Sequence, residues 1–214
     1  MQTKLIPVLL LSLIVAGCQL GITGSGVSKT EQRNVEDFDS VSLSGTGDVT
    51  IQVGQPKSVE VTLDDNLIGL VETRVENGKL IISAKEMYNT KLGLKVKIGT
   101  PNLTAASVSG VGDMTILEAT GDELELTVSG VGDITAKGTV KSVKANVSGT
   151  GDANLKDLIA ETVSVSVSGV GDAKVNATKS VDATASGVGN VEIYGNPADV
   201  KRNASGVGSV TIKN

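Results

Sequence analysis

The sequence predicts an all-β protein, built as a single-stranded, right-handed parallel β-helix with rungs of about 20 residues. Two observations carry this prediction: a five-residue motif recurs at nearly constant spacing, and apolar and polar residues alternate on both sides of it. Composition agrees, because 30 valines and only three aromatic residues suit a narrow, stacked interior. The 26 glycines among 214 residues then mark turns rather than disorder.

The repeated motif is Ser-Gly-(Val or Thr)-Gly-(Asp, Asn or Ser). It begins at Ser44, Ser109, Ser129, Ser148, Ser168, Ser186 and Ser205. From Ser109 onward the spacings are 20, 19, 20, 18 and 19 residues, whereas the first gap is 65 residues, close to three such units with longer loops. A period near 20 residues is typical of a stacked repeat rather than a compact globule.

Apolar residues at every second position flank each motif. Before Ser129 stand Leu124, Leu126 and Val128, and Ile134 follows the motif. This alternation predicts a strand, a tight turn, a second strand and a shorter third connection in each rung, and the repeats show no helical periodicity. Strands that return to the same register run parallel to their copies about 4.8 Å away, and parallel crossovers favour a right-handed path.

The motif glycines are expected to turn the chain sharply between sheets. Because glycine adopts positive φ without steric cost, we expect positive φ at both glycines of each motif. These turn glycines are Gly45, Gly47, Gly110, Gly112, Gly130, Gly132, Gly149, Gly151, Gly169, Gly171, Gly187, Gly189, Gly206 and Gly208.

The first 17 residues are predicted to be a signal peptide, in which Lys4 precedes an apolar run that is too short to span a bilayer. The residues Val15-Ala16-Gly17-Cys18 that end it resemble the lipobox of bacterial lipoproteins. That resemblance implies cleavage before Cys18, lipidation of Cys18 and a membrane anchor in the bacterial cell envelope. Gln19, in place of an Asp, favours the outer membrane by the same resemblance. The alternative is a secreted protein whose cysteine happens to lie near the cleavage site.

The mature chain is expected to have two parts. Residues 18–33 comprise the lipidated cysteine and a flexible Gly- and Ser-rich tether that lifts the domain off the membrane. Residues 34–214 form the β-helix domain, irregular over 34–101 and regular over 102–214. Arg202 falls at an inward position of the last rung, where it opposes edge-to-edge association or lies in a rung open to solvent.

Two runs in the irregular section carry a family resemblance. The first is Phe38-x-x-Val-x-Leu-x-Gly-x-Gly-Asp-Val-x-Ile-x-x-Gly54, and the second extends from Val59 to Ile82 through the turn Asn77-Gly78. Together with the later repeats, they resemble the head GIN domain family over residues 34–214. The resemblance implies a cell-surface protein or lipoprotein of the kind described as auto-transporter adhesins, with a parallel β-helix fold. It supplies no catalytic residues.

The acidic ladder at the end of successive motifs is the candidate metal site, and consists of Asp113, Asp133, Asp152 and Asp172, with Asp48 earlier. Stacked carboxylates about 5 Å apart repel one another, and Ca²⁺ would relieve that repulsion. The same position, however, holds Asn190 and Ser209. Asp, Asn and Ser share a short acceptor for backbone N–H groups, so turn capping is the favoured interpretation and Ca²⁺ binding the alternative.

Composition excludes several classes of function. With no histidine and one cysteine, the chain cannot assemble a structural zinc site or a Ser-His-Asp triad, and its net charge of −5 argues against nucleic acid as a partner. A polysaccharide-acting enzyme would need clustered acid, base or arginine groups and aromatic platforms. Pairs such as Asp64-Asp65 and Glu123 with Glu125 are interpreted instead as a loop and a solvated strand face.

The favoured function is therefore a surface-tethered adhesin or structural module that presents polar faces to a glycan or protein, without catalytic activity or a cofactor. A Ca²⁺-dependent binding module and a polysaccharide-acting enzyme are the alternatives.

Overall fold

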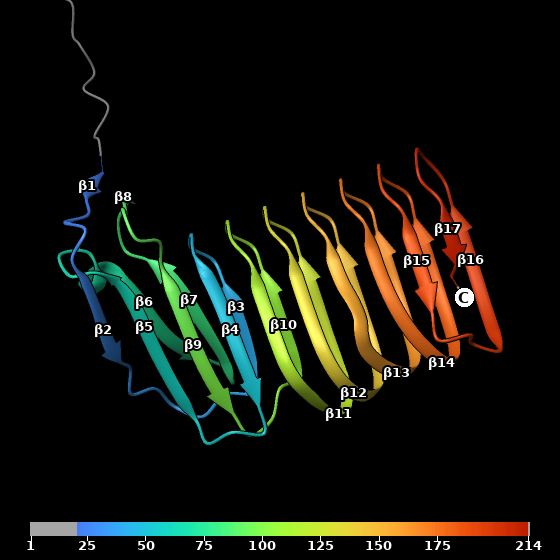
Figure 1. The fold of residues 1–214 in the computed structure, drawn as a ribbon, viewed down its shortest axis with the longest axis horizontal. Helices are drawn as coiled ribbons and strands as arrows, with labels where there is room; N and C mark the ends of the chain where they lie inside the picture. The colour runs from blue at the N-terminus through green and yellow to red at the C-terminus, as the bar shows by residue number, and fades with distance from the viewer. Residues whose placement is uncertain (1–20, 214) are drawn as a thin grey trace, which may run out of the picture.

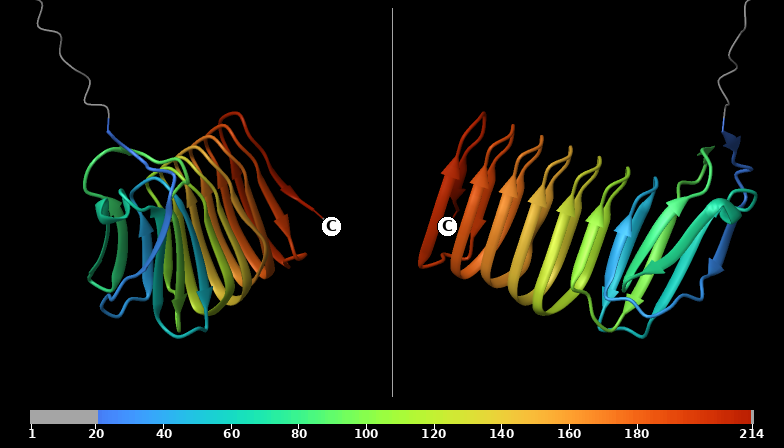
Figure 2. Two further views of the ribbon diagram at one scale, coloured as in Figure 1. Left: turned by 60° about the vertical axis from the view of Figure 1, so that its left-hand side comes forward. Right: turned by 180° about the vertical axis from the view of Figure 1, so that it is seen from behind.

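The computed structural model describes residues 21–213, which form one elongated β-solenoid (Figures 1 and 2). The predicted signal peptide and Cys18 lie outside the described residues. The strands are β1 (Ile22–Thr23), β2 (Ser28–Gln32), β3 (Ser40–Leu43), β4 (Asp48–Val53), β5 (Ser58–Asp64), β6 (Val71–Glu76), β7 (Lys79–Ala84), β8 (Tyr88–Asn89), β9 (Lys95–Thr100), β10 (Ala105–Val108), β11 (Met114–Val128), β12 (Ile134–Val147), β13 (Ala153–Val167), β14 (Ala173–Ala185), β15 (Val191–Tyr194), β16 (Asp199–Ala204) and β17 (Val210–Ile212). A single 3₁₀ turn, η1 (Ile68–Leu70), is the one helical element between residues 21 and 213. The all-β solenoid with rungs of about 20 residues is confirmed.

The regular repeats stack in parallel register. Leu126 of β11 lies beside Ala145 of β12, followed by Val165 of β13 and Ala183 of β14, and all four side chains are buried. Alternation of period two places these residues inside and their polar neighbours outside, as the sequence predicts. Each of the strands β11 to β14 runs through a bend between one corner turn and the next (Figure 1). The expected third connection is therefore part of a continuous strand.

The order of the N-terminal rungs differs from the prediction. β3 lies between β10 and β7, while β4 lies between β11 and β9. The corner that begins at Ser44 is therefore stacked directly on the corner that begins at Ser109, as the bridge from Thr46 to Val111 shows. The 65-residue gap does not hold three successive rungs. Instead, the chain leaves the stack after β4 and adds a rung made by β7 and β9 on the far side of β3 and β4.

Antiparallel strands close the N-terminal end of the solenoid. β5 pairs in antiparallel fashion with β9 and with β2, and β6 pairs with β7 in the same way. Residues 28–32, which the sequence suggested were tether, thus form strand β2 of the folded domain. The prediction of a flexible tether is therefore wrong for these residues. An exposed edge strand is as polar as a flexible linker, so composition alone does not distinguish the two.

The buried Asp64 joins three segments of this N-terminal cap. Its Oδ1 accepts a hydrogen bond from the Gly26 N–H at 2.6 Å, and its Oδ2 accepts one from the Thr90 hydroxyl at 2.5 Å and one from the Lys91 N–H at 3.2 Å. The Thr90 hydroxyl is the largest influence that holds the pKa of Asp64 below its ordinary value, and the backbone N–H groups add to it against the opposing effect of burial. One carboxylate therefore ties β5 to the segments before β2 and after β8.

At the C-terminal end, the described residues form no such cap. β16 and β17 are largely exposed, since no further rung in the described chain covers them. Arg202 stands in the register position of the buried Ala183, yet it is itself exposed. This exposure agrees with a rung that is open to solvent. Between residues 21 and 213 there is no helix with the length and apolar character to cross a membrane.

Candidate interaction surface

The corner turns form a ladder of their own along one edge of the solenoid. Parallel bridges connect Thr46, Val111, Val131, Thr150, Val170, Val188 and Val207 in succession. The Val131 N–H, for example, donates to the Gly110 carbonyl at 2.9 Å, and the Gly132 N–H donates to the Thr150 carbonyl at 3.0 Å. The turns therefore pack backbone against backbone, which leaves little room for side chains between rungs.

Two separate constraints, close contact with the neighbouring rung and positive φ, act on the corner glycines. A Cβ atom at Gly130 would overlap the carbonyl oxygen of Gly110, although the φ of Gly130 is not positive. Gly132 meets the Gly112 backbone in the same way and also has a φ of 144°. In this corner close approach of the neighbouring rung constrains both glycines, and positive φ is an added constraint at the second one.

The prediction of positive φ at every motif glycine is therefore wrong for part of the set. Positive φ occurs at Gly47, Gly112, Gly132, Gly151, Gly171 and Gly206. It does not occur at Gly45, Gly110, Gly130, Gly149, Gly169, Gly187, Gly189 or Gly208. In that second group every glycine except Gly45 would bring a Cβ into the backbone of the preceding rung, so steric contact between rungs is the constraint there.

The acidic ladder connects successive corners by hydrogen bonds. Oδ1 of Asp133 accepts from the N–H of Asp152 at 2.7 Å, and Oδ1 of Asp152 accepts from the N–H of Asp172 at 2.7 Å. The chain of bonds continues with Asn190, whose N–H donates to Asp172 at 2.7 Å, and ends where the Ser209 N–H donates to Asn190 at 3.2 Å. The side chains cap backbone groups as the favoured interpretation requires, but each caps the next rung rather than its own turn.

This arrangement places the four predicted metal ligands in a row rather than around one point. Within residues 21–213, no three His, Cys, Asp or Glu residues are grouped so that they could hold a metal ion. A shallow hollow of about 130 Å³ lies along Asp133, Asp152 and Asp172, but Lys174 also lines it. The positive charge of its ammonium group disfavours a bound cation in this hollow.

A second row, which the sequence reading did not single out, crosses the outer face beside the corners. Its members are Ser42, Ser107, Thr127, Asn146, Ser166, Thr184 and Asn203, each in direct register with the next. All are uncharged hydrogen-bonding side chains, and the Ser107 hydroxyl donates to the Ser42 hydroxyl at 2.9 Å. Ser42 is buried, whereas the members from Ser107 onward are half-buried or exposed. We call this set the hydroxyl–amide row. It could have been found from the sequence, since each member stands two residues before a motif serine.

Of the carboxylates considered for catalysis, Asp64 is buried at the end of β5 and does not lie in the predicted loop. Glu123 and Glu125 lie on a solvated strand face, as predicted. Glu125 pairs with Lys144 of the next rung at 2.9 Å, and this carboxylate raises the pKa of Lys144. Glu123 is exposed beside it. These residues border an open hollow of about 670 Å³, lined also by Asn102 and Asp122, which has neither an aromatic platform nor a cationic clamp among its lining residues.

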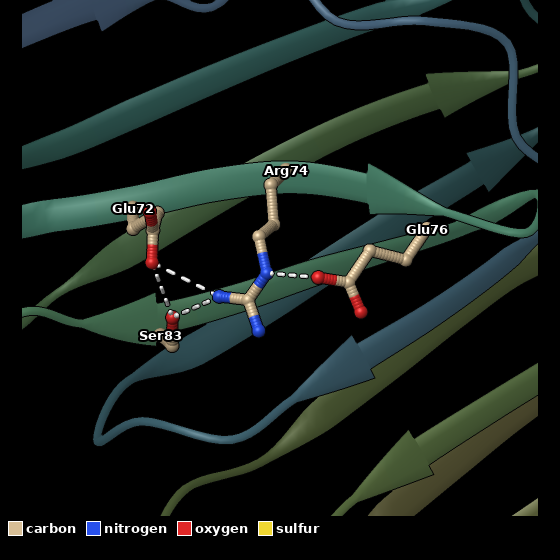
Figure 3. Close-up of polar contacts among 4 residues, drawn as sticks. All are labelled: Glu72, Arg74, Glu76 and Ser83. Atoms are coloured by element: carbon tan, nitrogen blue, oxygen red, sulfur yellow. Dashed lines mark hydrogen bonds and ion pairs between the residues drawn. The ribbon is translucent and has the colours of Figure 1, made fainter.

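The three arginines do not form a cluster that could bind an acidic sugar. Arg33 and Arg74 are already in ion pairs with glutamates, and Arg202 belongs to a different part of the solenoid. On the outer face of β6 and β7, the Arg74 Nε donates to Glu76 at 2.7 Å, and its Nη1 donates to Glu72 at 2.9 Å (Figure 3). The Glu76 carboxylate is the first cause of the raised pKa of Arg74. Arg33 pairs with Glu31 at 3.0 Å, and Arg202 lies at the opposite, open end of the solenoid.

Comparison with known proteins places this architecture in a family. The family model described as "Putative auto-transporter adhesin, head GIN domain" matches residues 37–197. The chain belongs to this family. The resemblance stated from the sequence is thereby confirmed for the domain, and the family description names no catalytic activity. A comparison with curated proteins finds no significant match.

Solved structures agree on the fold. A "putative adhesin" from Bacteroides fragilis is 26% identical, with a TM-score of 0.76 over 90% of this chain and 100% of its own. A "putative adhesin" from Parabacteroides distasonis is 23% identical, with a TM-score of 0.56 over 90% of this chain and 100% of its own. A "putative lipid binding protein" from the same species has the same identity of 23% and TM-score of 0.56, over 90% of this chain and 99% of its own.

Proposed function

We propose that this head GIN domain protein is a lipid-anchored adhesin of the bacterial cell envelope that binds an extended polar ligand, such as a surface glycan, without catalysis or a cofactor. Lipidation at Cys18 supplies the anchor, and Gln19 favours the outer membrane. Family membership supports the adhesin part of this proposal, while the lipobox-like residues before Cys18 support the anchor.

The hydroxyl–amide row is the observation that carries the proposal of a glycan ligand. Six half-buried or exposed donors and acceptors, from Ser107 to Asn203, stand in line, one per rung, at the spacing of about 4.8 Å that separates parallel strands. Sugar hydroxyls donate and accept hydrogen bonds, as these hydroxyl and amide groups do. A linear polysaccharide lying across the rungs could therefore meet several members of the row at once, and weak single contacts would add up.

A binding experiment on full-length protein tests this assignment. Glycan and protein arrays should identify a ligand for the wild type. A triple variant, Thr127→Ala with Asn146→Ala and Ser166→Ala, should lose at least tenfold in affinity if each lost hydrogen bond contributes about 0.5–1.5 kcal/mol.

The matched control is the triple variant Thr115→Ala, Thr135→Ala and Asn154→Ala, which truncates the same kinds of side chain in register on the other outer face. This control should bind as the wild type does. Equal losses in the two triple variants, or no ligand on any array, would contradict the proposed glycan site.

Membrane anchoring is tested separately by incorporation of labelled fatty acid into cells that express the protein. The wild type should become labelled and fractionate with outer membranes, whereas Cys18→Ala should remain unlabelled. A labelled Cys18→Ala protein would place the lipid elsewhere and exclude the proposed anchor.

A further inference from the structure

The first described residues are held firmly by the fold, which limits how far the anchor can lie from the domain. Ile22 and Thr23 pair with Tyr88 and Asn89 as strands β1 and β8, and a Cβ atom at Gly21 would overlap the Met87 carbonyl. If Cys18 is lipidated, as the proposed function holds, three peptide units separate it from Gly21. At about 3.6 Å per residue they reach roughly 11 Å at most. The anchor therefore cannot lift the domain away from the membrane.

The same edge of the solenoid carries both the start of the described chain and the corner turns. β1 and β8 lie at the top of Figure 1, and the turns that follow the rising strands of each rung lie along that edge in all views (Figures 1 and 2). The edge that faces the anchor is thus the edge on which the corners stack.

Exposed apolar side chains gather on this edge. Seven of the eleven exposed large hydrophobic residues within residues 21–213 belong to it, and we call them the apolar edge: Ile22, Met87, Val111, Val131, Val170, Val188 and Val207. Met87 is 83% exposed, and the valines from Val111 to Val188 are each about half exposed. Thr150 interrupts the row between Val131 and Val170, but an alignment of exposed apolar side chains along one edge is still uncommon on a surface that faces only water. By contrast, the bend at the opposite side of the repeats exposes one residue of this kind, Ile159 of β13.

The charged side chains beside the apolar edge indicate which kind of lipid headgroup this edge would contact. Val111, Val131 and Val170 each stand two residues before a ladder aspartate, so Asp113, Asp133 and Asp172 run parallel to this part of the apolar edge. The uncharged Asn190 and Ser209 take that position after Val188 and Val207. An anionic surface would repel these carboxylates, whereas the ammonium groups of zwitterionic headgroups would attract them.

We propose that the apolar edge rests on a zwitterionic phospholipid bilayer, so that the solenoid lies with its long axis along the membrane. The valine side chains enter the headgroup region, and the acidic ladder faces the headgroup ammonium groups. The outer strand faces, including the hydroxyl–amide row, stay free for a ligand.

Site-specific fluorescence on full-length lipidated protein in phosphatidylcholine vesicles tests this orientation. Lipidation occupies Cys18, so Val170→Cys and Ile159→Cys each offer a single free thiol for a fluorophore. Val170 lies at the corner that follows β13 and Ile159 lies at the bend of the same strand, which makes the second variant a matched control. Spin-labelled phosphatidylcholine should quench the fluorophore at position 170 strongly and leave the one at position 159 unchanged.

A second variant separates bilayer contact from mere proximity to the anchor. Thr46 and Thr150 already occupy the valine position of the corner, so the triple variant Val131→Thr, Val170→Thr and Val188→Thr should keep the fold. A fluorophore at Val207→Cys, at the end farthest from β1, should be quenched in the parent and lose most of that quenching in the triple variant. Replacement of phosphatidylcholine by anionic lipid should also reduce it.

The outcomes distinguish this inference from the proposed function. Protein that floats with vesicles but shows equal quenching at positions 159 and 170, or none at either, retains its anchor and overturns the orientation. Quenching that increases with anionic lipid overturns the choice of zwitterionic surface. Protein that does not float overturns both the anchor and the orientation.

Discussion

The regular repeats after residue 102 and the cap before it use the same corner motif but hold their strands by different means. In β11 to β14 most residues pair with the equivalent residue of the next rung, apart from register shifts near the bend, so that contacts repeat and involve nearest neighbours. In the cap, β2, β5 and β6 run antiparallel to their partners, and single residues such as Asp64 connect segments far apart in the chain. Repeated contacts between neighbouring rungs therefore stabilise the solenoid along its length, whereas unique contacts define its closed end.

The largest effect is expected from the corner glycines. Gly132→Ala combines a positive φ with a clash against the neighbouring rung and should cost about 3–5 kcal/mol of unfolding free energy. Gly130→Ala has the clash alone and should cost about 1–3 kcal/mol. Gly54→Ala, in the cap, has a φ of 80° but open space around it, and should cost about 1 kcal/mol.

Denaturant unfolding of the three variants measures this order. Gly69→Ala is the control, because its φ is not positive and nothing lies within 4 Å of an added Cβ. If Gly54→Ala were as damaging as Gly130→Ala, φ rather than rung contact would be the dominant constraint on the corners.

An intermediate effect is expected at Asp64, and it should depend on pH. The folded pKa of Asp64 lies below the unfolded value of about 3.9, so the charged form favours the folded state. The stabilisation is therefore fully present above the unfolded pKa and is lost as pH falls through the folded pKa. Asp64→Asn should melt at a lower temperature than the wild type at pH 7, and the difference should shrink below about pH 4.

Thermal melts from pH 7 to pH 3 measure this dependence. Asp65→Asn, which replaces the neighbouring exposed carboxyl group that accepts a hydrogen bond from the Ser25 hydroxyl, serves as the matched control variant. A difference between Asp64→Asn and wild type that stays constant across this range would contradict an ionised Asp64 as the link in the cap.

The smallest effect is expected in the acidic ladder. Asp152→Ala removes the acceptor for the Asp172 N–H and should cost about 0.5–1.5 kcal/mol. Asp152→Asn should be close to neutral, because Asn190 already serves as an acceptor at this position. Melting temperatures in EGTA and in millimolar Ca²⁺ should be equal. A rise with Ca²⁺ that Asp152→Asn abolishes would restore the metal interpretation of the ladder.

Much of the repeat region could be predicted from the sequence because its signal is redundant. The alternation around Leu124, Leu126 and Val128 recurs in every unit, and backbone stacking forces the register that the motif spacing implies. The cap offered no such redundancy. Its polar segment Ser28–Gln32 has the composition of a linker, and only the partner strand β5, some 30 residues later, makes it a strand.

The surface was predicted less completely, for a related reason. The acidic ladder was recognised as a set of acceptors, but a local turn was assumed where the donor belongs to the next rung. The corner valines were identified in the motif without being placed on the outside, because alternation is interrupted where a turn occurs. Exposure at a corner depends on how rungs stack, which is a property of the whole array.

The uncovered rung at the C-terminal end has a mechanical consequence. Hydrogen bonds between rungs run along the long axis, so a load applied between the two ends of the solenoid would pull directly against them. We expect β16 and β17 to peel away first and the rungs to open one after another, each at a modest force. A protein of this shape would lengthen gradually under flow and could refold onto the rungs that remain.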